Sequence, residues 1–151
     1  MPDHAFHELG DLLTKALIFG NFELYRSVFT LPVRFAPKDG KAYVLSDELA
    51  LREDFDLYVS IIKLHGVTDI YRQFLGYDRV ADGLMSVRWT THILVRARRL
   101  ADPFATRMLV TRGEGGWKIA AIESSEGHLN WTLGQAVVSP DGKFEPRKGE
   151  A

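Results

Sequence analysis

The chain has 151 residues, of which 46% are hydrophobic and 26% charged, a composition typical of one soluble globular domain. Nineteen Lys and Arg against 20 Asp and Glu give a net charge of −1, so we expect no nucleic-acid partner. The absence of cysteine excludes disulfides, cysteine nucleophiles and thiolate-bound metal centres. No apolar run approaches the roughly 20 residues of a membrane helix, and the first residues lack the pattern of a signal peptide. We therefore expect no membrane partner and a cytoplasmic location.

Residues 3–19 are predicted to form an amphipathic helix, because apolar residues recur there at steps of three and four. These apolar residues are Phe6, Leu9, Leu13, Ala16 and Leu17. Asn21 is suited to cap a second, short helix, which Pro32 is expected to end. The chain should therefore open with two helices in succession.

Two short apolar runs, 33–35 and 43–45, flank an Asp-Gly turn and predict a small hairpin. Ser46 is then expected to cap a third helix that runs to His65, and Gly66 is a suitable C-terminal stop. Leu51, Phe55, Tyr58, Ile62 and His65 share one face of that helix.

From residue 67 onward the hydrophobic period becomes that of strands. Residues 67–77 carry apolar residues on both parities, which indicates a bulge or burial on both faces. Residues 84–99 alternate, with the parity of Trp89 expected to face the helices and the parity of Arg88 and His92 to face outward. Together with strands over 104–112 and 117–125, short turns predict an antiparallel sheet of four long strands. This order of helices and strands is an α+β layer design.

Three segments resemble motifs of the NTF2-like superfamily, the SnoaL-like or cystatin-like α+β cone. They are Gly20-Asn21-Phe22-Glu23-Leu24-Tyr25, Ser46-Asp47-Glu48-Leu49 and Gly115-Gly116-Trp117-Lys118-Ile119-Ala120. The resemblance covers roughly residues 5–126. It implies a domain in which three helices pack on a curved antiparallel sheet and enclose an apolar pocket. We expect this single domain to span residues 1–138, and the polar composition of residues 139–151 predicts a flexible tail. The resemblance also implies a homodimer formed through the outer face of the sheet.

Members of this superfamily include ketosteroid isomerases, polyketide cyclases and scytalone dehydratases. The resemblance therefore implies a small-molecule-binding protein, and an isomerase, dehydratase or cyclase acting by acid/base proton transfer on an apolar substrate. Many members bind ligands or partners without catalysis, so the alternative is a non-catalytic homodimeric binding module. Six aromatic residues are expected to line the pocket: Phe22, Tyr25, Phe55, Tyr58, Tyr71 and Trp89.

The candidate catalytic residues are Asp69, Arg88 and His92. The epoxide hydrolases of the superfamily use an Asp–Arg–Asp set inside the cone, and Asp69 and Arg88 are strand residues of the right type. A cross-strand ion pair or two separate surface charges explain the same residues without catalysis. His92 is either a general base or an interfacial histidine on the outer face. The isomerase pattern is incomplete, since residues 3–19 contain no tyrosine and residues 32–36 no acid.

Four potential metal ligands lie near the N-terminus at helical spacing: His4, His7, Glu8 and Asp11. A metal site needs ligands that converge and a supporting second cluster, which a terminal helix alone does not provide. The chain contains no GxGxxG motif after a strand, P-loop, GxSxG or HExxH motif either. We therefore expect neither a metal nor a cofactor.

Overall fold

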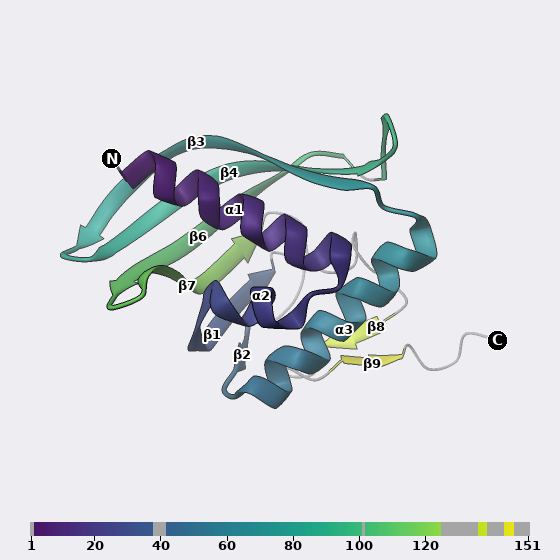
Figure 1. Ribbon diagram of the computed structural model, residues 1–151, viewed down its shortest axis with the longest axis horizontal. Helices are drawn as coiled ribbons and strands as arrows, with labels where there is room; N and C mark the ends of the chain where they lie inside the picture. Colours follow the sequence, from purple (N-terminus) through teal and green to yellow (C-terminus); the bar gives the residue numbers. More distant parts are fainter. Residues whose placement is uncertain (1, 38–41, 101, 125–135, 139–143, 147–151) are drawn as a thin grey trace.

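The computed structural model describes residues 2–37, 42–100, 102–124, 136–138 and 144–146. Three helices lie on one face of a curved seven-stranded sheet (Figure 1). The helices are α1 (Pro2–Phe19), α2 (Phe22–Ser27) and α3 (Glu48–His65). The strands of the sheet are β1 (Phe29–Pro37), β2 (Tyr43–Leu45), β3 (Asp69–Ala81), β4 (Leu84–Val95), β5 (Arg98–Arg99), β6 (Phe104–Gly113) and β7 (Gly116–Ser124). The predicted α+β architecture is confirmed.

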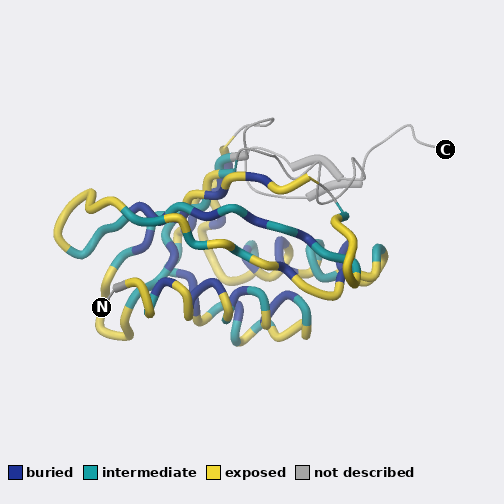
Figure 2. The backbone as a smooth tube through the Cα atoms, turned by 90° about the horizontal axis from the view of Figure 1, so that it is seen from above, coloured by how far each residue is buried: buried dark blue, intermediate teal, exposed yellow. Residues whose placement is uncertain are grey.

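The core fills the space between the helices and the sheet. Figure 2 shows that the helices bury the side toward the sheet and expose the other. The predicted apolar stripe of α1 is buried over its whole length, with Phe6 and Ala16 at 0% exposure. In β4 the predicted parity is also confirmed, since Val87, Trp89 and Ile93 are all buried. Removing these side chains from water on both layers drives their association.

The helix ends follow local capping chemistry. The Asn21 side chain accepts a hydrogen bond from the Leu24 amide at 3.1 Å, which confirms the predicted cap of α2. In α3 the cap is Asp47, whose Oδ1 accepts from the Ala50 amide at 2.9 Å, and the predicted Ser46 cap is wrong by one residue. Both residue types can cap a helix, so the local sequence did not distinguish them.

The sheet is mixed, with the strand order β2-β1-β7-β6-β4-β3. The pairs β3–β4, β4–β6 and β6–β7 are antiparallel as predicted, and Val33 lies opposite Leu45 in the predicted hairpin. β1 pairs with β7 in parallel, which joins this hairpin to the main sheet. Pro32 therefore lies within β1 and does not end α2, so that prediction is wrong. The register between β1 and β7 shifts at this point, between Phe29 and Arg34. A residue without an amide hydrogen is tolerated at such an irregularity.

The strand predicted over 84–99 divides in two. β4 ends at Val95 because Arg96 adopts a positive φ of 57°, and Arg98–Arg99 fold back as β5 on the end of β4. In β3 the register shifts between Phe74 and Gly76, which confirms the predicted bulge.

Beyond the main sheet, β8 (Ala136–Val138) pairs antiparallel with β9 (Phe144–Pro146). β9 falls inside the segment predicted as a tail. The rest of that segment, 139–143 and 147–151, and the tip of the first hairpin, 38–41, lie outside the described residues.

Candidate functional site

A buried carboxyl group lies on the inner face of α3. Asp54 is 0% exposed, although it belongs to a helix whose other acidic residues are exposed. The Tyr25 hydroxyl donates to Asp54 Oδ2 at 3.3 Å. Asp54 Oδ1 is buried and accepts no hydrogen bond from the described residues. A buried polar atom without a partner costs free energy, so a hydrogen bond to this oxygen would be stabilising.

Burial raises the pKa of Asp54 from its usual 3.8 to about 8. Desolvation is the dominant cause, because a carboxylate loses its hydration in the apolar interior. The hydroxyls of Tyr25 and Tyr43 oppose this shift by stabilising the ionised form, but less strongly. Asp54 is therefore mainly protonated at neutral pH and can donate a hydrogen bond.

Aromatic rings surround this carboxyl. Tyr25 packs against Phe55 with ring centroids 4.7 Å apart, and Phe55 packs against Phe22 at 5.5 Å. Tyr43 and Tyr58 are hydrogen-bonded through their side chains. Burial raises the pKa of the Tyr25, Tyr43 and Tyr58 hydroxyls, so all three remain protonated and can act as donors. We call Asp54 with these three tyrosines the Asp54 cluster.

Four of the six predicted pocket residues lie in or beside the Asp54 cluster: Phe22, Tyr25, Phe55 and Tyr58. The other two lie elsewhere. Trp89 is buried beneath α1, where its ring packs against Phe74 at 5.5 Å. Tyr71 is 55% exposed and pairs with His92 across the strands. Tyr71 does not point into the interior, because its parity in β3 is opposite to that of the buried Ile70. Together with Trp89 it lines a hollow between α1 and β3, and its role in ligand binding stays a prediction.

The three predicted catalytic residues do not converge. In the β3–β4 register, Asp69 lies opposite Leu94, whereas Arg88 lies opposite Gly76 at the other half of the strand pair. Arg88 instead approaches Asp78, with Nε 3.4 Å from Oδ2. His92 follows Arg88 by four residues on β4, a separation of roughly 13 Å at the usual rise of a strand. Asp69, Arg88 and His92 thus do not form one site, and their catalytic role stays a prediction.

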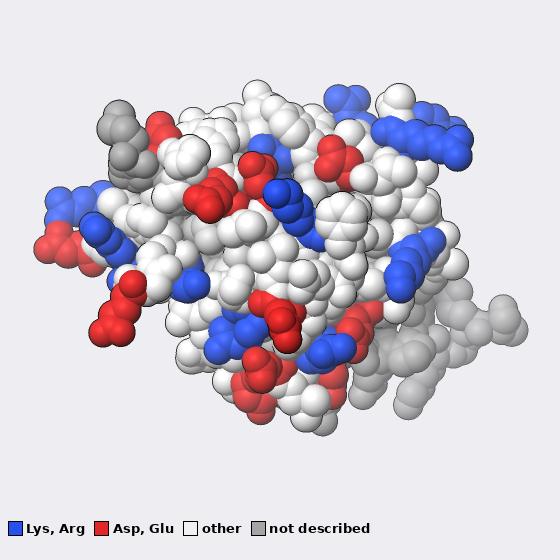
Figure 3. Space-filling view, in the orientation of Figure 1, with Lys and Arg blue, Asp and Glu red and all other residues white. Residues whose placement is uncertain are grey.

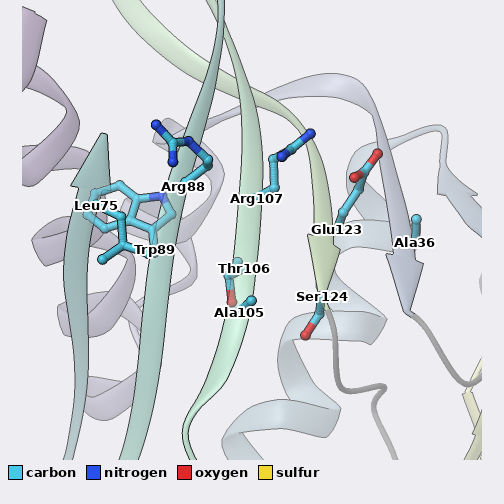
Figure 4. A pocket seen from close by; sticks show the side chains of 9 residues that line it. All are labelled: Ala36, Leu75, Arg88, Trp89, Ala105, Thr106, Arg107, Glu123 and Ser124. Carbon is cyan, nitrogen blue, oxygen red and sulfur yellow. The ribbon is translucent and has the colours of Figure 1, made fainter. Parts of the chain in front are cut away.

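A shallow hollow of about 430 Å³ lies over Arg88 and its neighbours in the sheet. Arg88, Arg107 and Glu123 are in register across β4, β6 and β7 (Figure 4). Leu75 and Ala36 complete its two sides. This hollow, which we call the outer hollow, is open and is lined by mixed charges and small apolar groups.

The sequence interpretation missed Asp54 and Tyr43. Asp54 lies three residues after Leu51 and four before Tyr58, so it belongs to the buried stripe of α3 by helical spacing. An acidic residue at a core position of a helix is the signal that identifies it. Tyr43 carried no such signal, because its approach to Asp54 depends on how the hairpin docks against α3.

Among the described residues, no three His, Asp or Glu side chains converge to hold a metal ion. None of the helices in this part of the chain is both long and apolar enough to cross a membrane. Over the face formed by the helices, acidic and basic side chains are interspersed without a continuous patch of either sign (Figure 3).

Neither a family model nor a curated protein matches the chain, but solved structures do. A domain of unknown function with a cystatin-like fold from Nostoc punctiforme aligns with a TM-score of 0.63 at 13% identity, over 82% of this chain and 76% of that one. An NTF-2-like protein of unknown function from Shewanella oneidensis aligns at 0.59 and 12%, over 82% and 98%. A protein from Shewanella frigidimarina named for a suspected ketosteroid isomerase activity aligns at 0.59 and 16%, over 78% and 92%. At these identities the similarity establishes the fold alone, and the chain has the NTF2-like, cystatin-like α+β cone fold that its sequence motifs predict.

Proposed function

We propose that the protein binds an apolar, carbonyl-bearing small molecule next to the Asp54 cluster and promotes proton transfer on it. The observation that carries the proposal is the buried carboxyl group whose Oδ1 has no hydrogen-bond partner among the described residues. A ligand oxygen placed there would receive the missing hydrogen bond. The names of several proteins that share the fold, which refer to dehydratases and an isomerase, agree with this class of chemistry.

The chemistry follows from the protonation state. A carboxyl group with a pKa of about 8 is protonated at neutral pH but loses its proton at small cost. The ionised fraction of Asp54 would accept the α-proton of the ligand, and the carboxylic acid formed in this way would return a proton to carbon. The hydroxyls of Tyr25 and Tyr43 would stabilise the ionised form of Asp54 that accepts this proton. The paired rings of Phe22 and Phe55 would provide an apolar surface for the ligand beside this carboxyl.

The experiment measures hydrogen exchange on a ligand. The protein is first screened by thermal shift with steroid-like and polyketide-like ketones, because a ligand that binds the native state raises its melting temperature. Stabilising ketones are then incubated with the protein in D2O, and loss of the α-proton signal is followed by NMR. We expect exchange with the native protein and a loss of about 100-fold or more with Asp54→Asn, since general acid–base groups contribute by that order.

Asp56→Asn is the matched control, because Asp56 lies on the exposed side of the same helix and pairs with Arg52 at 3.5 Å. Exchange that is equally fast in both variants would show that Asp54 is not the proton-transfer group. Stabilisation by ketones without any exchange would support binding without catalysis.

A second candidate function is that of a homodimeric binding module. It is favoured by the exposure of Tyr71 and Leu75, at 55% and 52%, on the strand that borders the outer hollow. Large apolar side chains exposed together are typical of association surfaces. Light scattering at micromolar concentration tests this candidate, since a monomer would contradict it.

A further inference from the structure

A second hollow, of about 380 Å³, lies between α1 and the edge strand β3. We call it the α1–β3 groove. Helix α1 contributes His7, Asp11 and Lys15, and strand β3 contributes Asp69, Arg72 and Phe74. Its volume falls within the range of small-molecule sites.

Arg72 lines this groove, and only part of its guanidinium group takes part in hydrogen bonds. Its Nη1 donates to Thr14 Oγ1 at 2.6 Å and to the Gly10 carbonyl at 3.3 Å. Both hydrogen bonds use the same nitrogen, and no carboxylate of the described residues lies within 4.0 Å of the guanidinium. A guanidinium offers five N–H donors in a planar fork, so the remaining edge is suited to a bidentate carboxylate.

Burial lowers the pKa of Arg72 to about 10, so the group is cationic at neutral pH but poorly solvated. The negative charges of Asp11 and Asp69 counteract this shift without forming an ion pair with the guanidinium. A partly desolvated charge that is only partly compensated gains from a ligand of opposite sign.

The charges of the groove select the class of ligand. Arg72 and Lys15 contribute two positive charges, and Asp11 and Asp69 contribute two negative charges. A simple anion would be attracted by the first pair and repelled by the second. A zwitterion presents one charge to each pair, so a groove with balanced charges favours it over an anion or a cation alone.

Aromatic side chains provide the apolar wall. His7 packs against Phe74 with ring centroids 4.9 Å apart, and Trp89 contacts both rings at 6.3 and 5.5 Å. The Trp89 indole nitrogen is buried without a hydrogen-bond partner among the described residues. Trp89 itself is buried, so the surface open to a ligand is that of His7 and Phe74, against which a flat ring could pack.

We propose that the α1–β3 groove binds an aromatic amino acid or a closely related aromatic zwitterion, with its carboxylate on Arg72 and its ammonium group toward Asp11 and Asp69. Arg72 influences the pKa of Tyr25, a member of the Asp54 cluster. No residue of the cluster lines the groove, however, and the proposal does not depend on the proposed proton transfer.

The test is calorimetric titration of the whole chain with three probes: L-phenylalanine, 3-phenylpropionate, which lacks the amine, and 2-phenylethylamine, which lacks the carboxylate. L-Phenylalanine should bind about tenfold or more tightly than either analogue, because each loses one charge-assisted interaction. Equal binding of 3-phenylpropionate, or no heat with any probe at millimolar concentration, would overturn the proposal.

Variants locate the site. Arg72→Gln should weaken both carboxylate probes, but it also removes hydrogen bonds that hold β3 to α1. Asp11 is exposed, so Asp11→Asn preserves the fold and should weaken binding of L-phenylalanine about tenfold. Binding of 3-phenylpropionate should not weaken, because the lost carboxylate only repelled that anion. Asp54→Asn should leave L-phenylalanine binding intact. If Asp54→Asn abolishes it and Asp11→Asn does not, the amino acid binds in the interior and the proposal fails, whatever the outcome of the exchange experiment.

Discussion

The substitution Asp54→Asn should change how the stability of the protein depends on pH. In the native state the pKa of Asp54 is about 8, whereas in the unfolded chain it is near 3.8. Between these values the native state keeps a proton that the unfolded state has released. Stability is therefore fully present below pH of about 4 and falls as the pH rises toward 8.

The magnitude follows from the shift. A native state that holds one extra proton loses about 1.4 kcal/mol of stability per pH unit. Between pH 4 and pH 7 the free energy of unfolding should therefore fall by about 4 kcal/mol. Solvent screening does not reduce this value, because Asp54 is 0% exposed. Asparagine has nearly the same shape and cannot ionise, so the variant lacks this pH-dependent loss. It should match the native protein near pH 4 and exceed it by a few kcal/mol at pH 7.

The assay is urea unfolding followed by circular dichroism at half-unit steps from pH 4 to pH 8. The difference in unfolding free energy between the variant and the native protein should grow with pH. Asp56→Asn is the control on the same helix, and its difference should stay within about 0.5 kcal/mol throughout, as for most surface substitutions. If the difference for Asp54→Asn is independent of pH, the carboxyl is not held protonated and the reasoning about the Asp54 cluster is refuted.

Gly66→Ala should lower the free energy of unfolding in urea by about 1–2 kcal/mol, because Gly66 ends α3 with a left-handed φ of 67°. No heavy atom lies within 4 Å of the added carbon, so this cost is backbone strain without a steric clash. Unchanged stability would show that the left-handed cap is not needed. Gly10→Leu should cost about 1–3 kcal/mol by overpacking, since an added Cβ would lie 3.3 Å from Trp89 Cη2, and unchanged stability would mean that α1 can move away from the sheet freely. If the protein is a homodimer, Leu75→Glu should largely dissociate it, because the substitution places a charge beside the outer hollow. Light scattering measures this change, and a dimer that persists would place the interface elsewhere.

Much of the fold was predictable because it follows from local periodicity. The stripe of α1 repeats at helical spacing and is buried as predicted, and the alternation in β4 places Trp89 beneath the helices. What could not be predicted depends on contacts between distant segments. The parallel pairing of β1 with β7 joins residues about 90 positions apart, and the short turns that govern the other strands give no information about it.

The site was less predictable than the fold for a physical reason. Strand register decides whether polar residues meet, and a bulge such as that before Gly76 changes it without a clear sequence signal. The separation of Asp69 from Arg88 follows from that register. Asp54 is different, because its place among Leu51, Phe55 and Tyr58 is fixed by helical geometry alone. An acid at a core position must either be neutral or have a partner, so this violation of the apolar pattern was the most informative feature of the sequence.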